Sequence, residues 1–147
     1  MVGLDVGFLE NILCVLVDVT RCGICDFVSI GRGKEIELQN LIYYRLVDRG
    51  LSVRRRVVLE GSGRPRVEVD LLVEDLVAVE VKCDRRFYEG IGQVLAVKEF
   101  YGKYGVLLHL VDDFSGDVLD GLRVLGNKYG FSVMVIRRQY RDLIVYW

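Results

Sequence analysis

Two short apolar segments that carry charged side chains constrain this chain most. Residues 66–82 alternate Val, Leu and Ala with acidic and basic residues, which is typical of two paired strands. Asp70 stands in the first strand, and the sequence Glu80-Val81-Lys82 follows ten positions later. Charges inside an apolar strand are costly unless a partner or a metal ion neutralises them. The run therefore predicts a β-hairpin that carries a cluster of functional charges.

The register of this hairpin follows from the alternation of side chains along a strand. On the second strand, Val77, Val79 and Val81 are expected on one face, and Ala78, Glu80 and Lys82 on the other. On the first strand, Val67, Val69 and Leu71 are expected to share one face, and Glu68, Asp70 and Leu72 the other. Asp70 stands across from Glu80 only if Glu74-Asp75-Leu76 form a three-residue loop, in which Asp75 best tolerates a left-handed conformation. We therefore predict that Asp70, Glu80 and Lys82 share one face.

This trio of charges indicates divalent-metal chemistry on phosphodiesters. Two neighbouring carboxylates repel each other unless a cation lies between them. Hard oxygen ligands suit Mg²⁺ or Mn²⁺, which would lower the pKa of a bound water and neutralise charge in the transition state. Lys82 could orient the attacking water or stabilise charge. The alternative is a surface strand whose outward residues are charged without a function.

Amphipathic helices are expected on both sides of the hairpin. In residues 35–47, Leu38, Ile42 and Leu46 recur at helical spacing, with Glu35 on their face and Glu37 at its edge. Either glutamate could instead simply complement the positive end of the helix. Residues 90–101 predict a second helix, and Gln93 in its first turn could donate a hydrogen bond to a phosphate or only to solvent.

Taken in order, these segments resemble the PD-(D/E)XK nuclease superfamily, which has the restriction-endonuclease-like fold. The resemblance runs over residues 33–112: an acidic helix, the Asp70 strand, the Glu80-Val81-Lys82 strand, the GIGQ sequence at 90–93 and a strand at 104–111. It is greatest toward small archaeal or viral nucleases, Holliday-junction-resolvase-like proteins and RecB-type domains. Val69 stands where many members have proline. Counting back from Leu46 and Gly50 places the helix acid at Gln39, so this motif is either shifted, to Glu35 or Glu37, or lost, and its loss would favour a one-metal site or an inactive relative.

The resemblance implies a role for each matching residue. Asp70 and Glu80 would bind the metal with the backbone carbonyl of Val81, and Glu35 would be a further ligand. Lys82 would be the catalytic lysine, Gln93 a supporting residue, and Glu35 or Glu37 the acid of the helix. The implied cofactor is Mg²⁺ or Mn²⁺ and the implied partner is DNA. A homodimer is expected where two strands are cut symmetrically.

The composition of the chain is that of a globular, single-domain protein with clustered basic residues. The 147 residues predict one domain, and 52% hydrophobic with 28% charged residues predicts a globular one. A net charge of −1 is not that of a general nucleic-acid binder. The basic residues are nevertheless clustered around the proposed site, where they could contact a DNA backbone or form a solvated face. The candidates are Arg54, Arg56, Arg64, Arg66, Arg85 and Arg86.

Neither a membrane segment nor a metal-binding cysteine motif is expected. The apolar stretch 8–19 contains Glu10 and Asp18 and is too short to span a bilayer. No signal peptide is recognisable, so we expect a cytoplasmic protein, or one in the host cytoplasm if the source is viral. Cys22 and Cys25 form a C-x2-C without a second pair, which favours free or structural thiols over a zinc site.

The predicted order of elements is an α/β fold with a restriction-endonuclease-like core. An N-terminal extension, residues 1–30, contains a helix at 8–17 that packs on the core or on a second subunit. The core at 33–112 has the order α-β-β-β-α-β, with a first strand at 51–60 and a turn at 61–65, which predicts a mixed sheet with helices on both faces. The C-terminal part, 113–147, is expected to add a helix at 117–128, a strand at 131–136, and a segment at 143–147 that closes the sheet edge or mediates a dimer. The lone His109 is expected to be a hydrogen-bonded core or edge residue.

Three functions remain open at this point. The first is a Mg²⁺-dependent deoxyribonuclease that acts on branched or structured DNA. The second is a catalytically inactive nucleic-acid-binding or assembly module on the same fold. The third is a thiol protein that uses Cys22 and Cys25.

Overall fold

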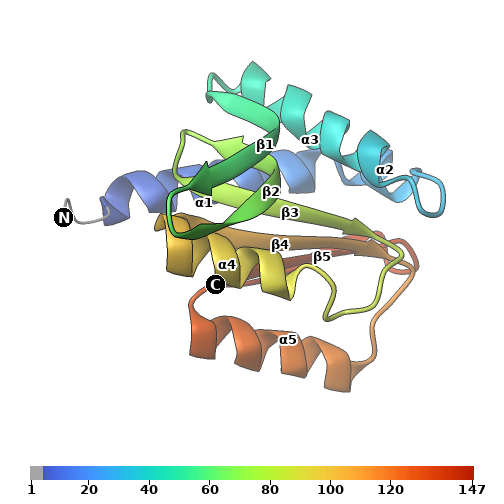
Figure 1. Cartoon of the computed structure of the whole chain (residues 1–147). Coiled ribbons are helices and arrows are strands. Elements are labelled where there is room, and N and C mark those ends of the chain that lie inside the picture. Colours follow the sequence, from blue (N-terminus) through green and yellow to red (C-terminus); the bar gives the residue numbers. More distant parts are fainter. Residues whose placement is uncertain (1–4) are drawn as a thin grey trace.

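The computed structural model describes residues 5–147, which fold into an α/β structure with a six-stranded mixed sheet and five helices (Figure 1). The helices are α1 (Val6–Cys22), α2 (Ile24–Val28), α3 (Glu35–Asp48), α4 (Ile91–Tyr101) and α5 (Gly116–Tyr129). The strands are β1 (Val53–Gly61), β2 (Arg64–Val73), β3 (Val77–Cys83), β4 (Tyr104–Val111), β5 (Ser132–Arg137) and β6 (Asp142–Tyr146). The predicted order of helices and strands is thus observed, with the short helix α2 as an addition that the sequence did not predict.

The six strands follow one another across the sheet in sequence order. β1, β2 and β3 form an antiparallel meander, and β6 pairs antiparallel with β5. The β3–β4 and β4–β5 pairs are parallel, with α4 and α5 as their crossover connections. The C-terminal segment therefore closes one edge of the sheet as β6, which was one of its two predicted roles.

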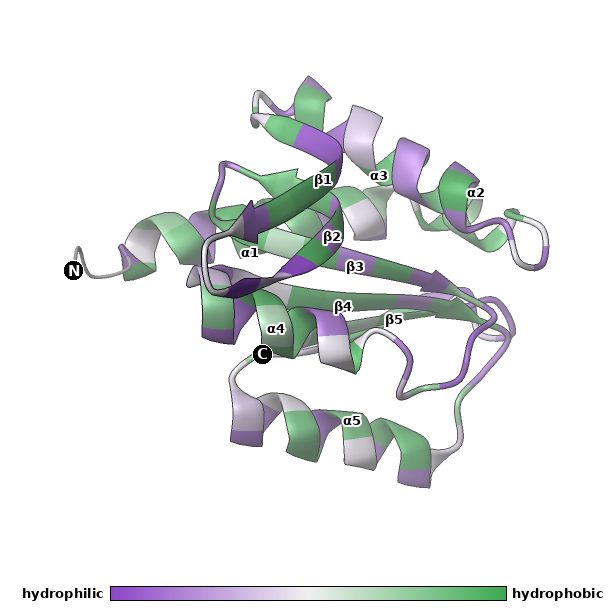
Figure 2. Cartoon of the chain, viewed as in Figure 1, coloured by the Kyte–Doolittle hydropathy of each residue, from purple (hydrophilic) through white to green (hydrophobic). Residues whose placement is uncertain are grey.

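The sheet separates two helical layers. On one face, α1, α2 and α3 pack on side chains such as Val79, Val81 and Leu108. On the other face, α4 and α5 cover Leu107 and Val133 (Figure 1). Figure 2 shows β4 and β5 coloured mostly as hydrophobic, with hydrophilic colour on the loops where these strands end. The polar segments next to β4 and β5 thus gather at the ends of these strands, and the carboxyl ends of parallel strands are where open α/β sheets commonly bind ligands.

The N-terminal helix α1 belongs to the core. Its Ile12 and Leu16 are completely or almost completely buried, in the same cluster as residues of α3 and the sheet. Asp5 caps the helix by accepting a hydrogen bond from the backbone N–H of Phe8 at 3.1 Å. Of the two predicted positions for this segment, packing on the core is observed. No helix between residues 5 and 147 is long and apolar enough to cross a membrane.

The β1–β2 turn is shorter than predicted. β2 begins at Arg64 rather than after Pro65, and Gly61 pairs with Arg64, so that only Ser62 and Gly63 form the turn. The predicted turn at 61–65 is wrong at its C-terminal end because a bulge accommodates the proline. The register shifts between Leu59 and Gly61, beside Pro65, and a residue without an N–H is tolerated at such an irregularity.

The side chains of β2 switch the side of the sheet to which they point between Val69 and Leu71. Val69 packs beside α4 in one cluster, whereas Leu71 packs with α1 and α3 in another. The prediction that Val67, Val69 and Leu71 share a face is therefore wrong for Leu71. The β1 register places Arg56 opposite Asp70, and Arg56 has a left-handed φ of 53°. This backbone irregularity breaks the strict alternation of the ribbon at Asp70.

Candidate functional site

The predicted register of the β2–β3 hairpin is observed. Leu71 pairs with Val79 and Val73 with Val77, which leaves Glu74-Asp75-Leu76 as the loop and sets Asp70 opposite Glu80. Asp75 has the expected left-handed conformation, with φ 54°. Glu74 shares it, with φ 52°, which the sequence did not predict. The loop length therefore fixes the pairing from which the site is built.

Asp70 lies where β2 leaves β3. The regular pairing ends at Leu71 and Val79, and the backbone N–H of Val81 donates instead to Asp70 Oδ2 at 2.8 Å. The carboxylate of Asp70 therefore replaces the β2 backbone as the partner of this amide. Because the N–H and C=O of one strand residue point to the same side, the Val81 carbonyl also faces the gap beside Asp70. The Asp70 carboxylate and the Val81 carbonyl thus lie on the same side of β3.

Glu80 and Lys82 lie on the β3 face that α4 covers. Lys82 Nζ is 3.3 Å from Glu80 Oε1, and the side chains of Lys82 and Glu80 are only 16% and 7% exposed. Gly90, at the start of α4, has a φ of 95°, and a Cβ there would lie 3.3 Å from both Glu80 Cγ and Lys82 Cε and 2.5 Å from Leu107. Gly90 is therefore required for these two side chains to fit under α4, a role that the sequence did not indicate.

The carboxyl groups of Asp70 and Glu80 repel each other when both are ionised. Burial, reinforced by the neighbouring Asp70, raises the pKa of Glu80 to about 8. Burial also raises the pKa of Asp70, against the opposing effects of the Val81 amide, Glu80 and Lys82. Without a cation, Glu80 keeps its proton at neutral pH and hydrogen-bonds to Asp70. A cation between Asp70 and Glu80 would relieve this repulsion, and in its absence a proton on Glu80 relieves part of it.

This repulsion predicts that the metal-free protein loses stability as the pH rises. Glu80 contributes fully below its ordinary pKa of 4.5, and that stability is lost as the pH rises through about 8, because the folded state holds a proton that the unfolded state releases. From pH 4.5 to 8 we expect the Glu80 contribution to the free energy of unfolding to fall by roughly 2–4 kcal/mol. Urea unfolding in chelator should show this decline in the wild type and a flatter profile in Glu80→Gln. Equal slopes in both proteins would contradict it.

Of the two candidate helix acids, only Glu35 lies at the site. Its charge raises the pKa of Asp70, and its Oε2 accepts a hydrogen bond from Arg85 Nε at 2.8 Å. Leu38, Ile42 and Leu46 on its face of α3 are fully buried, as the spacing predicted. Glu37 is exposed to solvent. Glu35 is therefore the acid that the fold places near Asp70.

Gln93 lies at the mouth of the site. It lines an open surface pocket of about 390 Å³ together with Lys82, Arg85 and Gly90. It also borders a smaller gap that Glu80 lines. The first turn of α4 thus brings the Gln93 amide close to both charged residues of β3. It does so because the 84–90 loop returns the chain directly over the end of that strand.

The six arginines predicted to contact nucleic acid are all exposed, but their surroundings differ. Arg54 is paired with Asp75 at 3.1 Å, Arg66 lies 4.0 Å from Glu60, and Arg85 is paired with Glu35. Arg64 and Arg86 lie over the rings of Tyr101 and Tyr88, at 5.6 Å and 6.0 Å from the ring centroids. Arg56 is opposite Asp70 in the register of β1 and β2. Arg56 and Arg85 therefore lie next to residues of the site, whereas Arg54, Arg64, Arg66 and Arg86 have partners elsewhere on the surface.

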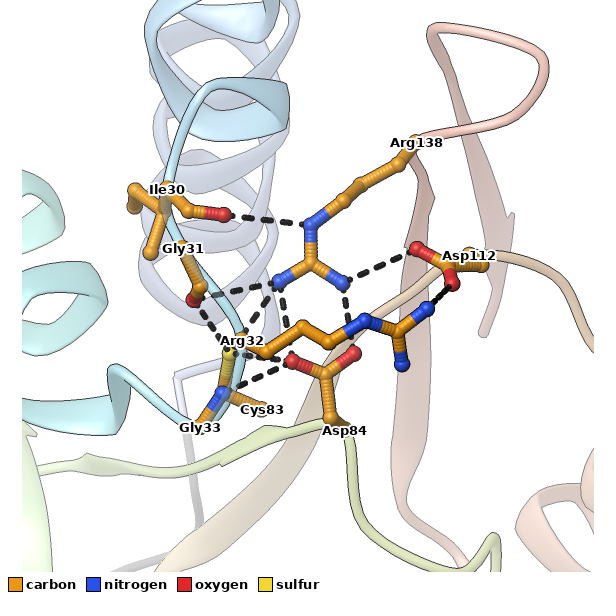
Figure 3. A network of polar contacts seen from close by, with 8 residues as sticks. All are labelled: Ile30, Gly31, Arg32, Gly33, Cys83, Asp84, Asp112 and Arg138. Atoms are coloured by element: carbon orange, nitrogen blue, oxygen red, sulfur yellow. Dashed lines mark hydrogen bonds and ion pairs between the residues drawn. The ribbon is translucent and has the colours of Figure 1, made fainter.

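A partly buried ion-pair network at the ends of three strands was not predicted (Figure 3). Arg138, after β5, donates to both carboxylate oxygens of Asp84, at 2.5 and 3.0 Å, and to Asp112 at 3.3 Å. It also donates to the backbone oxygen of Ile30 at 3.1 Å, and Asp84 accepts from the amide of Gly33 at 2.9 Å. Burial pushes the pKa of Asp84 up, but the hydrogen bonds from Arg138 and Gly33 outweigh this and lower it to about 2. The network fixes the loop that leads into Glu35.

His109 occupies the core beside Lys82 on the neighbouring strand. It is completely buried, and its ring packs edge-to-face on Phe114 at 5.2 Å. Within the part of the chain that the structure describes, neither ring nitrogen has a hydrogen-bond partner. The prediction of a core position is therefore confirmed, while that of a hydrogen bond is not. Burial lowers the pKa of His109 to about 4, so the ring is neutral at physiological pH.

The cysteines form no disulfide in the described chain. Cys14, Cys22 and Cys25 are exposed free thiols, and Cys83 is a buried one. Cys22 Sγ lies 3.9 Å from Asp18 Oδ1, one turn earlier on α1. Cys14, Cys22 and Cys25 lie on α1 and α2, away from Asp70 and Glu80, whereas Cys83 is the last residue of β3. No disulfide joins these cysteines, so the thiol part of the prediction holds, while their role stays a prediction.

Across residues 5–147, no three His, Cys, Asp or Glu side chains are grouped as a ready-made metal site. The acidic centre consists of the Asp70–Glu80 pair, with Glu35 nearby but bound to Arg85. Comparisons with protein-family models, curated proteins and solved structures gave no match. The function must therefore be argued from the geometry of this centre.

Proposed function

We propose that this chain is a Mg²⁺- or Mn²⁺-dependent nuclease built on a restriction-endonuclease-like core. The observation that carries the proposal is the pair of the half-buried Asp70 and the buried Glu80, with Lys82 in contact, at the point where β2 leaves β3. A fold gains nothing in stability by burying two facing carboxyls beside a lysine. Such a cost is common at sites that bind a cation and a phosphate.

The residues present fit a small dication. The Asp70 and Glu80 carboxyls and the Val81 carbonyl provide oxygen ligands on one side, and the raised pKa of Glu80 reflects charge that a cation would neutralise. The remaining positions would face the pocket that Lys82 and Gln93 line, where water and phosphate oxygens have room. Glu35 would complete the site after separating from Arg85.

Asp70, Lys82 and Gln93 would each have a separate role in the reaction. When bound, the cation would supply electrostatic stabilisation and an activated water nucleophile. Asp70 is held in place by the Val81 amide, so its orientation is set before substrate arrives. Lys82 lies between Glu80 and the pocket, where its ammonium would neutralise charge that develops on the phosphate. Gln93 would orient the phosphate or the attacking water through its amide.

A direct test incubates the protein with labelled linear, flap, overhang and four-way DNAs and with the matching RNAs. Parallel reactions contain Mg²⁺, Mn²⁺, Ca²⁺ or chelator. We expect cleavage with Mg²⁺ or Mn²⁺ and none with chelator. Cleavage that persists in chelator, or no cleavage of any substrate under any condition, would contradict the proposal. The second outcome would favour an inactive nucleic-acid-binding module, which the Arg85–Glu35 pair and the two-carboxyl centre also permit.

Arg85 is expected to compete with the cation for Glu35. Its guanidinium Nε is 2.8 Å from Glu35 Oε2, and a metal ion would need the same carboxylate. Arg85→Ala should therefore bind Mn²⁺ about three- to tenfold more tightly in isothermal calorimetry without DNA, because an exposed pair contributes only about 1 kcal/mol. It should also bind DNA more weakly, since one phosphate contact is lost.

Arg123→Ala is the control for Arg85, because Arg123 is an exposed arginine that pairs with Asp120 at 3.8 Å on α5, away from the site. This variant should leave the affinities for Mn²⁺ and DNA unchanged. An Arg85→Ala protein with the wild-type affinity for Mn²⁺ would show that Glu35 is not a ligand.

A further inference from the structure

An arginine on β1 is held against α3 by aromatic and amide groups. The guanidinium carbon of Arg55 lies 4.1 Å from the centroid of the Tyr43 ring and 5.6 Å from that of Tyr44. Arg55 Nη1 donates to Asn40 Oδ1 at 3.0 Å, and the two tyrosine rings meet edge-to-face at 5.1 Å. The guanidinium is therefore fixed in place while its charge remains uncompensated.

Arg55 and Arg56 differ from the neighbouring arginines because they have no carboxylate partner among residues 5–147. Neighbouring arginines are neutralised: Arg54 by Asp75, Arg49 by Asp18 and Arg45 by Asp26. Within residues 5–147, neither Arg55 nor Arg56 forms an ion pair with a carboxylate, and with Asn40 they line a surface pocket of about 320 Å³. Two uncompensated charges beside a pocket attract an anion, even though the chain has a net charge of −1.

This surface begins directly beside the carboxyl pair. Arg56 is opposite Asp70 in the β1–β2 register, and α3, which carries Asn40 and Tyr43, starts at Glu35. Away from the site, the surface ends at Tyr44, whose side chain is 57% exposed. A nucleic-acid strand that passes the carboxyl pair would therefore meet the charge of Arg56 first and the exposed ring of Tyr44 next.

We propose that Asn40, Tyr43, Tyr44, Arg55 and Arg56 form a platform for single-stranded nucleic acid, and this inference rests on the proposed nuclease function. Stacking on Tyr44 requires a base whose face is open, and the bases of an intact duplex are already stacked on one another. Arg55 and Arg56 would hold the phosphates between that base and the cut. The substrate is accordingly one with a single-stranded segment beside the cut, such as a flap or an overhang.

The test measures binding without cleavage. Fluorescence anisotropy in chelator compares a labelled single strand with the duplex of the same sequence. Tyr44→Ala should weaken single-strand binding about tenfold, which is the effect of losing one stacked base, and should leave duplex binding within twofold of the wild type. Tyr44→Phe should bind as the wild type does. Arg55→Met should weaken single-strand binding to a similar extent and reduce its salt dependence.

Tyr129→Ala provides the control, because Tyr129 is also exposed but lies at the end of α5. Thermal unfolding of every variant checks that the fold is intact. Equal losses on single strand and duplex would assign the surface to duplex backbone contacts, and no loss in Tyr44→Ala or Arg55→Met would exclude the platform. A wild type that cleaves, together with Tyr44→Ala and Arg55→Met proteins that bind normally, overturns only this inference. A wild type that binds the single strand through Tyr44 but never cleaves overturns the nuclease proposal instead.

Discussion

Asp70→Asn and Lys82→Ala are each expected to reduce Mn²⁺-dependent cleavage by about a thousandfold or more. Asn keeps the shape of Asp70 and the acceptor for the Val81 amide, but it removes the charge that would hold a cation. Ala at position 82 removes the only ammonium in contact with Glu80 among the described residues, so charge on the phosphate would be left unneutralised. Single-turnover cleavage of the best DNA substrate measures both effects.

Two neighbours serve as controls for this pair of variants. Glu68 is an exposed acid two residues from Asp70 on β2, and Lys128 is an exposed lysine on α5. Glu68→Gln and Lys128→Ala should cleave at the wild-type rate. The Asp70→Asn protein should be at least as stable as the wild type in chelator, because a neutral group replaces a buried carboxyl whose pKa is raised. If the two site variants retained most of their activity, the carboxyl pair would not be the active site.

Arg138→Met is expected to cost roughly 3–5 kcal/mol of unfolding free energy. The side chains of Arg138 and Asp84 are 13% and 16% exposed, so the variant leaves the Asp84 charge buried without its partner. Met keeps much of the volume of the side chain, and the loss therefore reports the ionic contacts. The loop from Ile30 to Gly33 loses the hydrogen bonds that Arg138 provides, so the start of α3 should also exchange its amide hydrogens faster.

The pH dependence of this effect has a definite sign. The folded pKa of Asp84 is lowered to about 2 from 3.8, so its contribution is present above pH 3.8 and is lost as the pH falls through about 2. Denaturant unfolding should therefore show a large difference between wild type and Arg138→Met at pH 6 and a smaller one at the lowest pH at which both still fold. Arg123→Met, at an exposed pair, should change stability by less than about 1 kcal/mol. A change of similar size in both variants would show that the network adds nothing beyond a surface pair.

Much of the local structure could be predicted because it follows from the period of the apolar residues. The spacing of Leu38, Ile42 and Leu46 predicted α3, and the limits of β4 at Tyr104 and Val111 were predicted to the residue. The loop length between Val73 and Val77 fixed the pairing of Asp70 with Glu80, because a strand alternates strictly over a short distance. The juxtaposition of these two acids is therefore a property of the sequence.

Other features were decided only when distant segments packed together. The side chains of β2 switch faces at Asp70, opposite the left-handed Arg56 on the neighbouring strand, and no local sequence pattern predicts this switch. Arg85 was predicted to contact DNA, but the fold sets it on Glu35, 50 residues earlier in the chain. Arg138 meets Asp84 and the carbonyl of Ile30, which lies 108 residues before it, because the ends of three strands converge there. Periodicity reports which face of an element is buried, whereas partners across the chain depend on how the elements pack, and that information is not contained in any short stretch of sequence.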